Sequence, residues 1–227
     1  AGFALSYANI DVDGKSAANS QTDTDQFQGT LYGTMMMDNF YVNGTLAYAY
    51  ADNDSVRTTN ANLTANGDYD TDTFSASIGA GMPMDMGTFS LTPQANLTYA
   101  HINTEAYTET GNSVLTVDTD NMNVVHLIAG VSMNTKIEQS EGTLVPNLRL
   151  MADWDITQEE SESDSNYAGA ASFKTLGAEP AALGGIAGLG LDYNTNDGLY
   201  NVSVGYDASF REDYVSHAGS VKVRYNF

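Results

Sequence analysis

The sequence predicts an all-β protein, an antiparallel up-and-down transmembrane β-barrel of about ten strands. About ten segments alternate apolar with polar residues, which is the two-residue period of a strand with two different faces. Aromatic residues gather toward the ends of the apolar faces, and short connections alternate with long ones along the chain. No segment keeps the 3.6-residue period of a helix, and no run of about 18 apolar residues could form a transmembrane helix.

The first half of the chain supplies the segments at about 1–13, 23–37, 40–51, 74–84 and 89–99. The chain begins in what reads as the middle of a strand, so we expect a mature or truncated start. The third segment places Phe, Val, Gly, Leu and Tyr at even positions, and Tyr, Asn, Thr and Ala at odd positions. The fourth and fifth set Ser, Gly, Thr, Gln and Asn against their apolar residues, so each qualifies as a two-faced strand.

The second half supplies the segments at about 123–135, 144–156, 181–194, 199–211 and 214–227. The segment at 144–156 has Leu, Pro, Ala, Trp and Ile on one face and Asn, Arg and Asp on the other. The segment at 199–211 has Tyr, Val, Ala and Phe on one face and Asn, Ser and Asp on the other. The last segment ends in VKVRYNF and has one apolar and one polar face. Its apolar face carries Val221, Val223, Tyr225 and Phe227.

A soluble β-sandwich also alternates, so other features must separate the two classes. The polar faces carry Ser, Thr, Asn, Gln, Gly and Ala, whereas a bulk protein surface is rich in Lys and Glu. Outer-membrane barrels have short turns at one end and long loops at the other. The expected short connections are 37–39, 85–88, 135–141 and 194–198. The expected long connections are at about 14–23, 52–72, 102–123 and 157–180.

The chain is strongly acidic, with 29 Asp and Glu against 8 Lys and Arg and a formal net charge of −21. Phosphate binding needs clusters of cationic residues, so no nucleic-acid partner is expected. The absence of cysteine excludes disulfides, zinc knuckles and thiol nucleophiles. At 227 residues the chain fits one all-β domain, and we expect a single outer-membrane barrel domain over 1–227.

Many of the acidic residues fall in the expected long loops or at their roots. They are Asp23, Asp25, Asp52, Asp54, Asp68, Asp70, Asp72, Asp118, Asp120, Glu159, Glu160, Glu162 and Asp164. The simpler interpretation is a solvated external rim. The alternative is that clusters such as TDTDQ and DYDTDT hold Ca²⁺ or Mg²⁺ and bridge to lipopolysaccharide phosphates, because hard cations prefer carboxylate oxygens. The residue spacing of an EF-hand is absent.

The polar faces of the last four strands carry both signs of charge. The residues expected to face the lumen are Arg149, Asp153, Asp155, Asp192, Asp207, Arg211, Lys222 and Arg224. One interpretation is that neighbouring strands pair these charges for stability, and the other is that the charges bind a polar plug or line a pore. Gly184, Gly188 and Gly190 share this face, where missing side chains leave room for a helix or for close strand packing.

An enzyme is the least favoured class, and we assign no catalytic residue, cofactor or metal. Small outer-membrane hydrolases need His next to Asp, or Ser and His with an orienting group. His101 and His217 share parity with apolar residues, whereas His126 faces the lumen without an acidic residue near it in the sequence. The methionines cluster at two strand ends, where flexible apolar filler at the lipid boundary explains them better than a metal site.

Three stretches resemble the β-domain of autotransporters, the type V secretion family of Gram-negative bacteria. FSLTPQANLTYAHINTEAYTETG resembles a central strand of that family through Pro93, Leu97, Tyr99 and Glu109. VSVGYDASFREDYVSHAGSVKVRYNF resembles its last hairpin through Tyr206, Asp207, Tyr214 and His217. YVNGTLAYAYADNDSVR also fits a strand of the family, with Arg57 in the loop after it. Together the similar stretches span essentially the whole chain.

The resemblance implies a barrel in the outer membrane of a Gram-negative bacterium, with a role in transport. The implied partners are outer-membrane lipid, lipopolysaccharide, an upstream passenger bound for the cell surface and the barrel assembly machinery. That machinery reads the last strand as a signal, here Val221, Val223, Tyr225 and Phe227. The alternative function is a free-standing small porin or surface-loop barrel with no passenger.

Barrels of this family usually have twelve strands, and a helix that threads the lumen precedes them. About ten strands are visible here, and Ala1 falls where the third strand of the family would begin. We therefore expect either a fragment or a smaller relative that closes with fewer strands.

Overall fold

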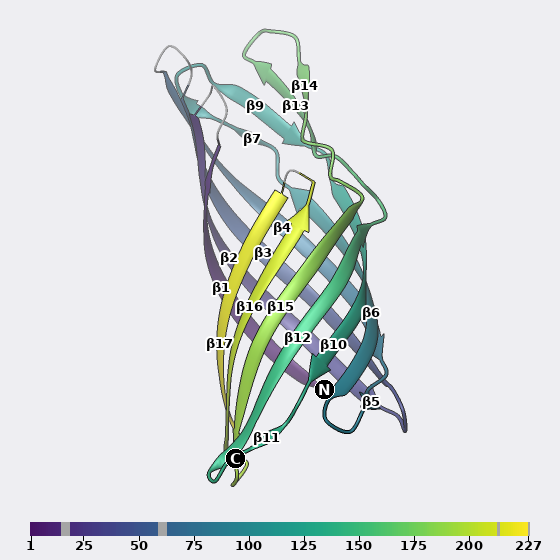
Figure 1. The fold of residues 1–227 in the computed structure, drawn as a ribbon. Helices are drawn as coiled ribbons and strands as arrows, with labels where there is room; N and C mark the ends of the chain where they lie inside the picture. Colours follow the sequence, from purple (N-terminus) through teal and green to yellow (C-terminus); the bar gives the residue numbers. More distant parts are fainter. Residues whose placement is uncertain (15–18, 59–62, 213, 227) are drawn as a thin grey trace.

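The computed structural model describes residues 1–14, 19–58, 63–212 and 214–226. Ten long strands form one antiparallel sheet in the order β1-β2-β3-β4-β6-β10-β12-β15-β16-β17 (Figure 1). These strands are β1 (Gly2–Asp13), β2 (Asn19–Met36), β3 (Tyr41–Thr58), β4 (Thr64–Gly81), β6 (Ser90–Thr104), β10 (Met122–Asn134), β12 (Gly142–Asp155), β15 (Leu183–Thr195), β16 (Tyr200–Arg211) and β17 (Tyr214–Tyr225). The predicted all-β, up-and-down class of about ten strands is confirmed.

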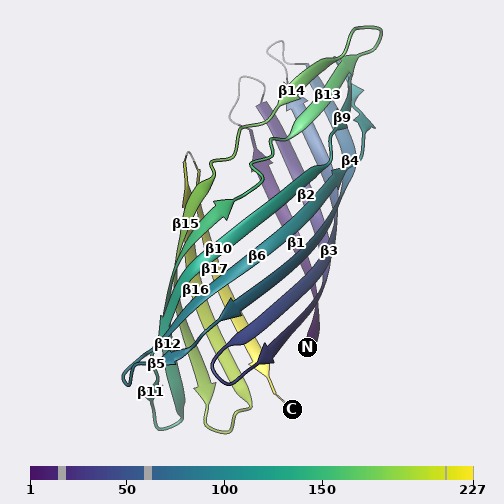
Figure 2. The ribbon, with the colours of Figure 1, turned by 90° about the vertical axis from the view of Figure 1, so that its right-hand side faces the viewer.

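The sheet curls strongly but stays open between its first and last strands (Figures 1 and 2). Within the described residues, β1 pairs on one side only, with β2, and β17 pairs on one side only, with β16. These ten strands therefore do not close the barrel by themselves, and the sheet has two free edges.

The wall of the curled sheet is much taller on one side than on the other. Strands β2, β3 and β4 each contain 18 residues, whereas β16 and β17 contain 12. About 9–11 residues of a tilted strand cross a bilayer, so β2, β3 and β4 continue beyond the membrane. The long loops expected at 14–23 and 52–72 are wrong for residues 19–23, 52–58 and 64–72, which lie in strands, whereas residues 15–18 and 59–62 lie outside the described residues. Their Asp and Thr residues alternate, and that alternation keeps the backbone extended and paired with the adjacent strands.

The short connections lie at one end of the molecule, together with both termini (Figures 1 and 2). We call this end the turn end and the opposite one the loop end. Strands β2 and β3 are joined here between Met36 and Tyr41, and β15 and β16 between Thr195 and Tyr200. Two short strands, β5 (Met84–Asp85) and β11 (Ile137–Glu138), extend the sheet at the same end. The predicted short turns are thus present.

A second, four-stranded sheet stands at the loop end (Figure 1). Its order is β14-β13-β9-β7, with bounds β7 (Tyr107–Thr108), β9 (Leu115–Thr119), β13 (Glu162–Tyr167) and β14 (Phe173–Leu176). A further short strand, β8 (Thr110–Gly111), pairs with β4. The expected long loops at 102–123 and 157–180 therefore hold strands that the sequence analysis did not predict.

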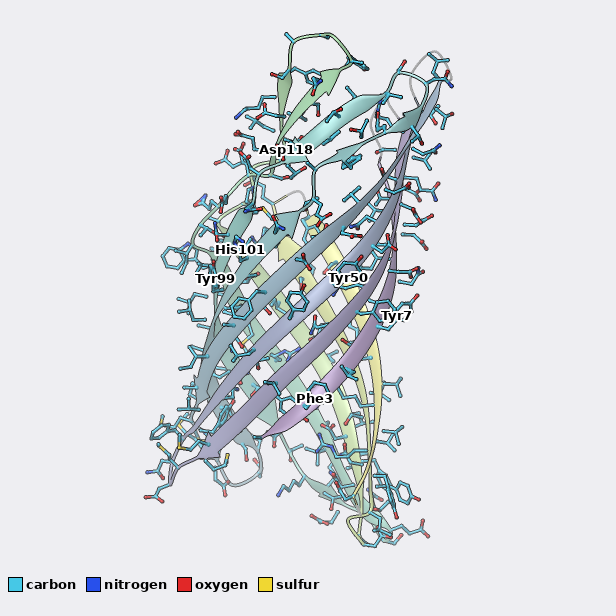
Figure 3. The ribbon with its side chains drawn as sticks, turned by 180° about the vertical axis from the view of Figure 1, so that it is seen from behind. Phe3, Tyr7, Tyr50, Tyr99, His101 and Asp118 are labelled. Carbon is cyan, nitrogen blue, oxygen red and sulfur yellow. The ribbon has the colours of Figure 1, made fainter. Side chains whose placement is uncertain are left out.

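Large apolar side chains lie on the convex face of the curled sheet. Figure 3 shows Phe3, Tyr7, Tyr50 and Tyr99 on this wall. Leu5 is 76% exposed, and no described large side chain is fully buried. A soluble protein would bury such residues, whereas a barrel in lipid turns them outward. The described ranges contain no helix long and apolar enough to cross a membrane.

The concave face is lined by small residues. The buried small side chains of this face are Ala47, Ala49 and Ala51 of β3 and Ala65 of β4. The three alanines of β3 lie on the face opposite Leu46, Tyr48 and Tyr50, because successive residues of a strand point to opposite sides. These small side chains therefore leave space on the inside of the curled sheet.

Candidate functional site

Strand register brings opposite charges together on the concave wall. Arg149 of β12, Gly188 of β15 and Asp207 of β16 lie directly opposite one another in three adjacent strands. The Nη2 atom of Arg149 lies 2.5 Å from Oδ1 of Asp207, so this ion pair passes over β15. A Cβ atom at Gly188 would meet the Asp207 carboxylate. The space that the glycine leaves is filled by an ion pair that lies flat on the wall.

We expect Gly188→Ala to displace the carboxylate of Asp207 and break its pair with Arg149. Both side chains are partly exposed, so the expected loss in the free energy of unfolding is at most about 1 kcal/mol. Denaturant titration of the protein in lipid vesicles measures this loss. Gly219→Ala is the matched control, because nothing lies near a Cβ atom there and the expected change is smaller. A larger loss for the control would contradict the assignment.

A second cluster, which we call the clasp, consists of His126, Asp153, Asp155 and Arg211. The Nη2 atom of Arg211 lies 2.6 Å from Oδ2 of Asp153, and its Nη1 atom lies 3.6 Å from Oδ2 of Asp155. The Nδ1 atom of His126 lies 2.8 Å from Oδ1 of Asp153, and its Nε2 atom lies 3.8 Å from Oδ2 of Asp155. Gly184 lies between Asp153 and Arg211 in the register, so the glycine pattern of the first ion pair is repeated.

The clasp also holds the ends of three strands near the loop end. Thr157 donates its hydroxyl to Oδ1 of Asp155 at 3.0 Å, and the backbone N–H of Gln158 donates to the same oxygen at 3.0 Å. Arg211 donates to the carbonyl oxygen of Ala181 at 3.1 Å. The chain entering β15 and the chain leaving β12 are therefore both attached to β16.

His126 has no acidic residue near it in the sequence, as expected, but two acidic residues lie beside it in the structure. Its partners come from β12, which pairs with β10 and places Asp155 directly opposite His126. The other two histidines bind neutral groups, since Nδ1 of His101 lies 3.0 Å from Oδ1 of Asn123. Nδ1 of His217 lies 2.7 Å from the hydroxyl of Tyr206. Only the strand register, which sequence separation does not reveal, could have identified the partners of His126.

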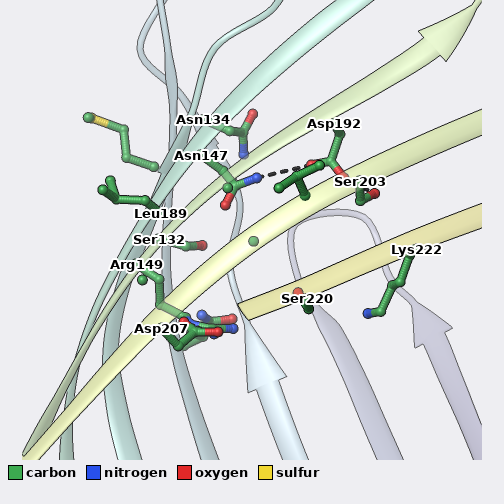
Figure 4. A pocket seen from close by; sticks show the side chains of 16 residues that line it. Ser132, Asn134, Asn147, Arg149, Leu189, Asp192, Ser203, Asp207, Ser220 and Lys222 are labelled. Carbon is green, nitrogen blue, oxygen red and sulfur yellow. Dashed lines mark hydrogen bonds and ion pairs between the residues drawn. The ribbon is translucent and has the colours of Figure 1, made fainter. Parts of the chain in front are cut away.

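The remaining concave-face charges make no ion pair within the described ranges. Asp192 accepts hydrogen bonds from Asn147, at 3.0 Å, and from Ser203. Lys222 lies opposite Ser203, and Arg224 lies opposite Asn201. A cavity of about 410 Å³ runs along this part of the wall (Figure 4). Its polar lining includes Asn147, Arg149, Asp192, Ser203, Asp207, Ser220 and Lys222.

The apolar stripe of the last strand lies on the convex face of β17. Val221 and Val223 are 73% and 71% exposed, and Tyr225 is also exposed. The ring centroids of Tyr225 and Tyr200 lie 5.2 Å apart, so aromatic rings group together near the turn end. Phe227 lies outside the described residues. That the barrel assembly machinery recognises this stripe stays a prediction.

The acidic residues form rows on the upper part of β1 to β4. Asp11, Asp23, Asp54 and Asp68 lie directly opposite one another across the four strands. Loss of solvent raises the pKa of Asp54, and its hydrogen bond with Asp68 and nearby carboxylates raise it further. The described residues contain no group of three or more His, Asp or Glu arranged to hold a metal ion. The binding of divalent cations at these acidic segments therefore stays a prediction.

Comparison with solved structures gives the same fold. The translocator domain of the autotransporter NalP from Neisseria meningitidis matches with a TM-score of 0.77 and 19% identity. The match covers 99% of this chain and 74% of that chain. The β-domain of the Bordetella autotransporter BrkA matches with a TM-score of 0.62 and 12% identity, over 99% of this chain and 91% of that one.

Two curated relatives carry the name outer membrane protein A, from Rickettsia conorii and Rickettsia rickettsii. Each is 26% identical to this chain over 243 residues, a match that covers 98% of the chain. The chain spans only 12% and 11% of the lengths of these relatives. The family model described as autotransporter beta-domain matches residues 1–207. With its curled antiparallel sheet and outward apolar face, the chain belongs to the autotransporter β-domain family, a family of non-enzymatic translocators in the outer membrane of Gram-negative bacteria.

Proposed function

We propose that this chain is the membrane translocator of a longer protein, which it anchors in the outer membrane while an upstream passenger passes to the cell surface. The observation that carries the proposal is the concave wall. Alanines on β3 and ion pairs that lie flat over the glycines of β15 leave a polar passage inside the sheet. A polypeptide in transit needs such a passage, because its unpaired backbone groups cannot enter lipid.

The position of the termini and the length of the relatives support this proposal. Both termini lie at the turn end (Figure 1), so a segment joined ahead of Gly2 starts there. Two further upstream strands return the chain to the turn end, so the segment ahead of them reaches the loop end by running along the concave wall. The chain spans about an eighth of the Rickettsia conorii relative, since it covers 12% of that length. A long upstream passenger fits both facts.

The two free sheet edges call for further strands in the membrane. Within the described part of the chain, no strand of this sheet pairs with the outer edge of β1 or with that of β17 between Tyr214 and Arg224. Unpaired backbone groups in hydrocarbon each cost several kcal/mol. We therefore propose that two upstream strands, as the family resemblance implies, close the barrel between β1 and β17, with residues 1–227 in that single domain.

The proposed partners follow from the faces of the sheet. The exposed apolar convex face contacts outer-membrane lipid, and its upper rim meets lipopolysaccharide. The barrel assembly machinery binds the stripe of β17 that contains Val221, Val223 and Tyr225, together with Phe227.

An epitope tag placed in the passenger of the full-length protein, ahead of the two proposed upstream strands and of the segment that runs through the lumen, tests the export proposal. We expect antibody and added protease to reach the tag on intact cells. The matched control lacks residues 214–227, loses the last strand and should keep the tag inside the cell. A barrel that folds in the outer membrane with its tag in the periplasm would overturn export, and would favour a free-standing porin or surface-loop barrel.

A further inference from the structure

The second sheet packs against the concave side of the tall wall. The rings of Tyr107 in β7 and Tyr69 in β4 stack, with centroids 4.6 Å apart and planes 16° apart. A Cβ atom at Gly67 would meet the ring of Tyr107, so this ring lies directly on the backbone of β4. Burial raises the pKa of both tyrosines, which agrees with a contact closed to solvent. The contacts between the second sheet and the barrel strands run mainly through β4.

A buried ion pair, which we call the latch, holds this contact in place. The Nε atom of Arg57 in β3 donates to Oε1 of Glu109 at 2.9 Å, and its Nη2 atom donates to Oε2 at 2.5 Å. The same Nη2 atom donates to the carbonyl oxygen of Ser113 at 2.9 Å. The backbone N–H of Leu115 donates to Oε2 of Glu109 at 2.9 Å. One guanidinium thus fastens the whole turn between β7 and β9 to the wall.

The latch is the strongest polar contact between the two sheets. The Glu109 side chain is only 6% exposed, so its charge is stable there only while Arg57 neutralises it. A two-pronged pair between arginine and carboxylate is among the strongest hydrogen-bonded arrangements in proteins. The other ion pair of the second sheet, between Lys174 and Glu162, joins β14 to β13 and makes no link to the barrel.

The connections of the second sheet leave it free to move as one body once the latch opens. Its strands pair with one another, in the order β14-β13-β9-β7. Beyond the latch and the tyrosine stack, it is attached by the two-residue pairing of β8 with β4 and by its chain links to the barrel, of which those from β6 to β7 and from β9 to β10 are two residues each. A unit with so few contacts opens at a lower free energy than the ten-stranded wall does.

We propose that the second sheet is a flap at the loop end of the lumen, and that the Arg57–Glu109 latch holds it against the tall wall. This inference rests on the proposed function, because the flap stands where the passenger would leave. With the latch closed, the flap stays on β3 and β4 and leaves the side of β15 to β17 clear. With the latch open, the flap is free to swing into the path of the emerging chain.

Trypsin added to intact cells tests the latch, because Lys174 is the single basic residue of the second sheet. We expect Arg57→Ala to raise the rate of cleavage after Lys174 by about tenfold or more, since the sheet loses hydrogen bonds to a charged group and, without the support of the wall, its strand pairs open more often. Arg149→Ala is the matched control, because its ion pair lies on the wall away from the flap and should leave this rate unchanged. The fragment that starts at Thr175 identifies the cleavage site.

The heat-dependent gel mobility of the folded barrel separates a released flap from an unfolded protein. The proposal expects unchanged mobility in Arg57→Ala, and restored protection when Arg57→Glu is combined with Glu109→Arg. Unchanged cleavage in Arg57→Ala would overturn the proposal. If that variant fails to fold, Arg57→Lys keeps the charge but loses the two-pronged pair, and cleavage equal to the unmodified protein would then overturn it.

Export is measured separately with the tag in the passenger, so the two proposals can fail independently. Slower tag display in Arg57→Ala, with a folded barrel and faster cleavage at Lys174, supports the flap. Normal display with faster cleavage would show that the sheet is released without entering the path, which overturns the flap. A tag that stays inside the cell even without any substitution would instead overturn the translocator function, while the cleavage test would still report on the latch.

Discussion

Placing an arginine at Val204 is expected to lower the free energy of unfolding by about 2–4 kcal/mol. Val204 lies on the convex face of β16 and is 53% exposed in the absence of lipid. Its cross-strand neighbours are Leu191 on β15 and Val221 on β17, so the substitution puts a charge into an aliphatic band. In the membrane this band faces hydrocarbon, where the guanidinium loses its hydration.

Ser203→Arg is the control, because Ser203 precedes Val204 in the chain and points to the opposite face. Ser203 donates to Asp192 and lies opposite Lys222, so an arginine there meets a carboxylate and the polar lumen. Urea titration in lipid vesicles, followed by the fluorescence of Trp154, compares the two variants; the chain has one tryptophan, and it is exposed on the wall. If the two substitutions prove equally harmless, the convex face is not the lipid face.

The transmembrane strands could be predicted from the sequence because each repeats one local rule. The period of two in 40–51 or 199–211 follows from the pleat, so it appears in any strand with one face in lipid. Short turns such as the one between Met36 and Tyr41 follow from the same pattern, because alternation stops there. Local patterns of this kind need no knowledge of the neighbouring strand.

The upper ends of β2 to β4 could not be predicted, because outside the membrane the apolar face is replaced by aspartate. Segments such as TDTDQ and DYDTDT still alternate, but both residue types are polar and read as loop. The pairing of Asp23 with Asp54 and of Asp54 with Asp68 places like charges side by side. Sequence rules disfavour such a pairing, so the tertiary structure overrides them here.

The contacts of the candidate site depend on the register of the strands, and the composition of the chain does not determine that register. His126 and Asp153 are 27 residues apart in the chain, and Arg57 and Glu109 are 52 apart. A register shift of one residue would turn either partner to the opposite face. Parity alone placed Asp153 and Arg211 on the same face as Gly184, but it did not show that the glycine lets the two charges meet.

Replacing Arg211 with leucine is expected to lower the free energy of unfolding by about 2–3 kcal/mol, the usual value of hydrogen bonds between charged groups. Arg211 is the only arginine of the clasp and contacts both Asp153 and Asp155. Its loss leaves the carboxylates of Asp153 and Asp155 without the guanidinium charge that contacts both of them. Removing one charged member of such a cluster destabilises a protein more than replacing the whole cluster with apolar residues does, because the remaining charges stay desolvated.

Arg224→Leu is the matched control for Arg211→Leu, since it removes the same group from the same face of the next strand. Within the described residues Arg224 makes no ion pair, so we expect a change within about 0.5 kcal/mol. Equal losses in the two variants would mean that the clasp adds nothing beyond general arginine packing. In the double variant Asp153→Asn with Arg211→Leu, the loss should be smaller than the sum of the single losses, because the two side chains act through one contact. The clasp joins β10, β12 and β16, so its loss should loosen this side of the sheet first.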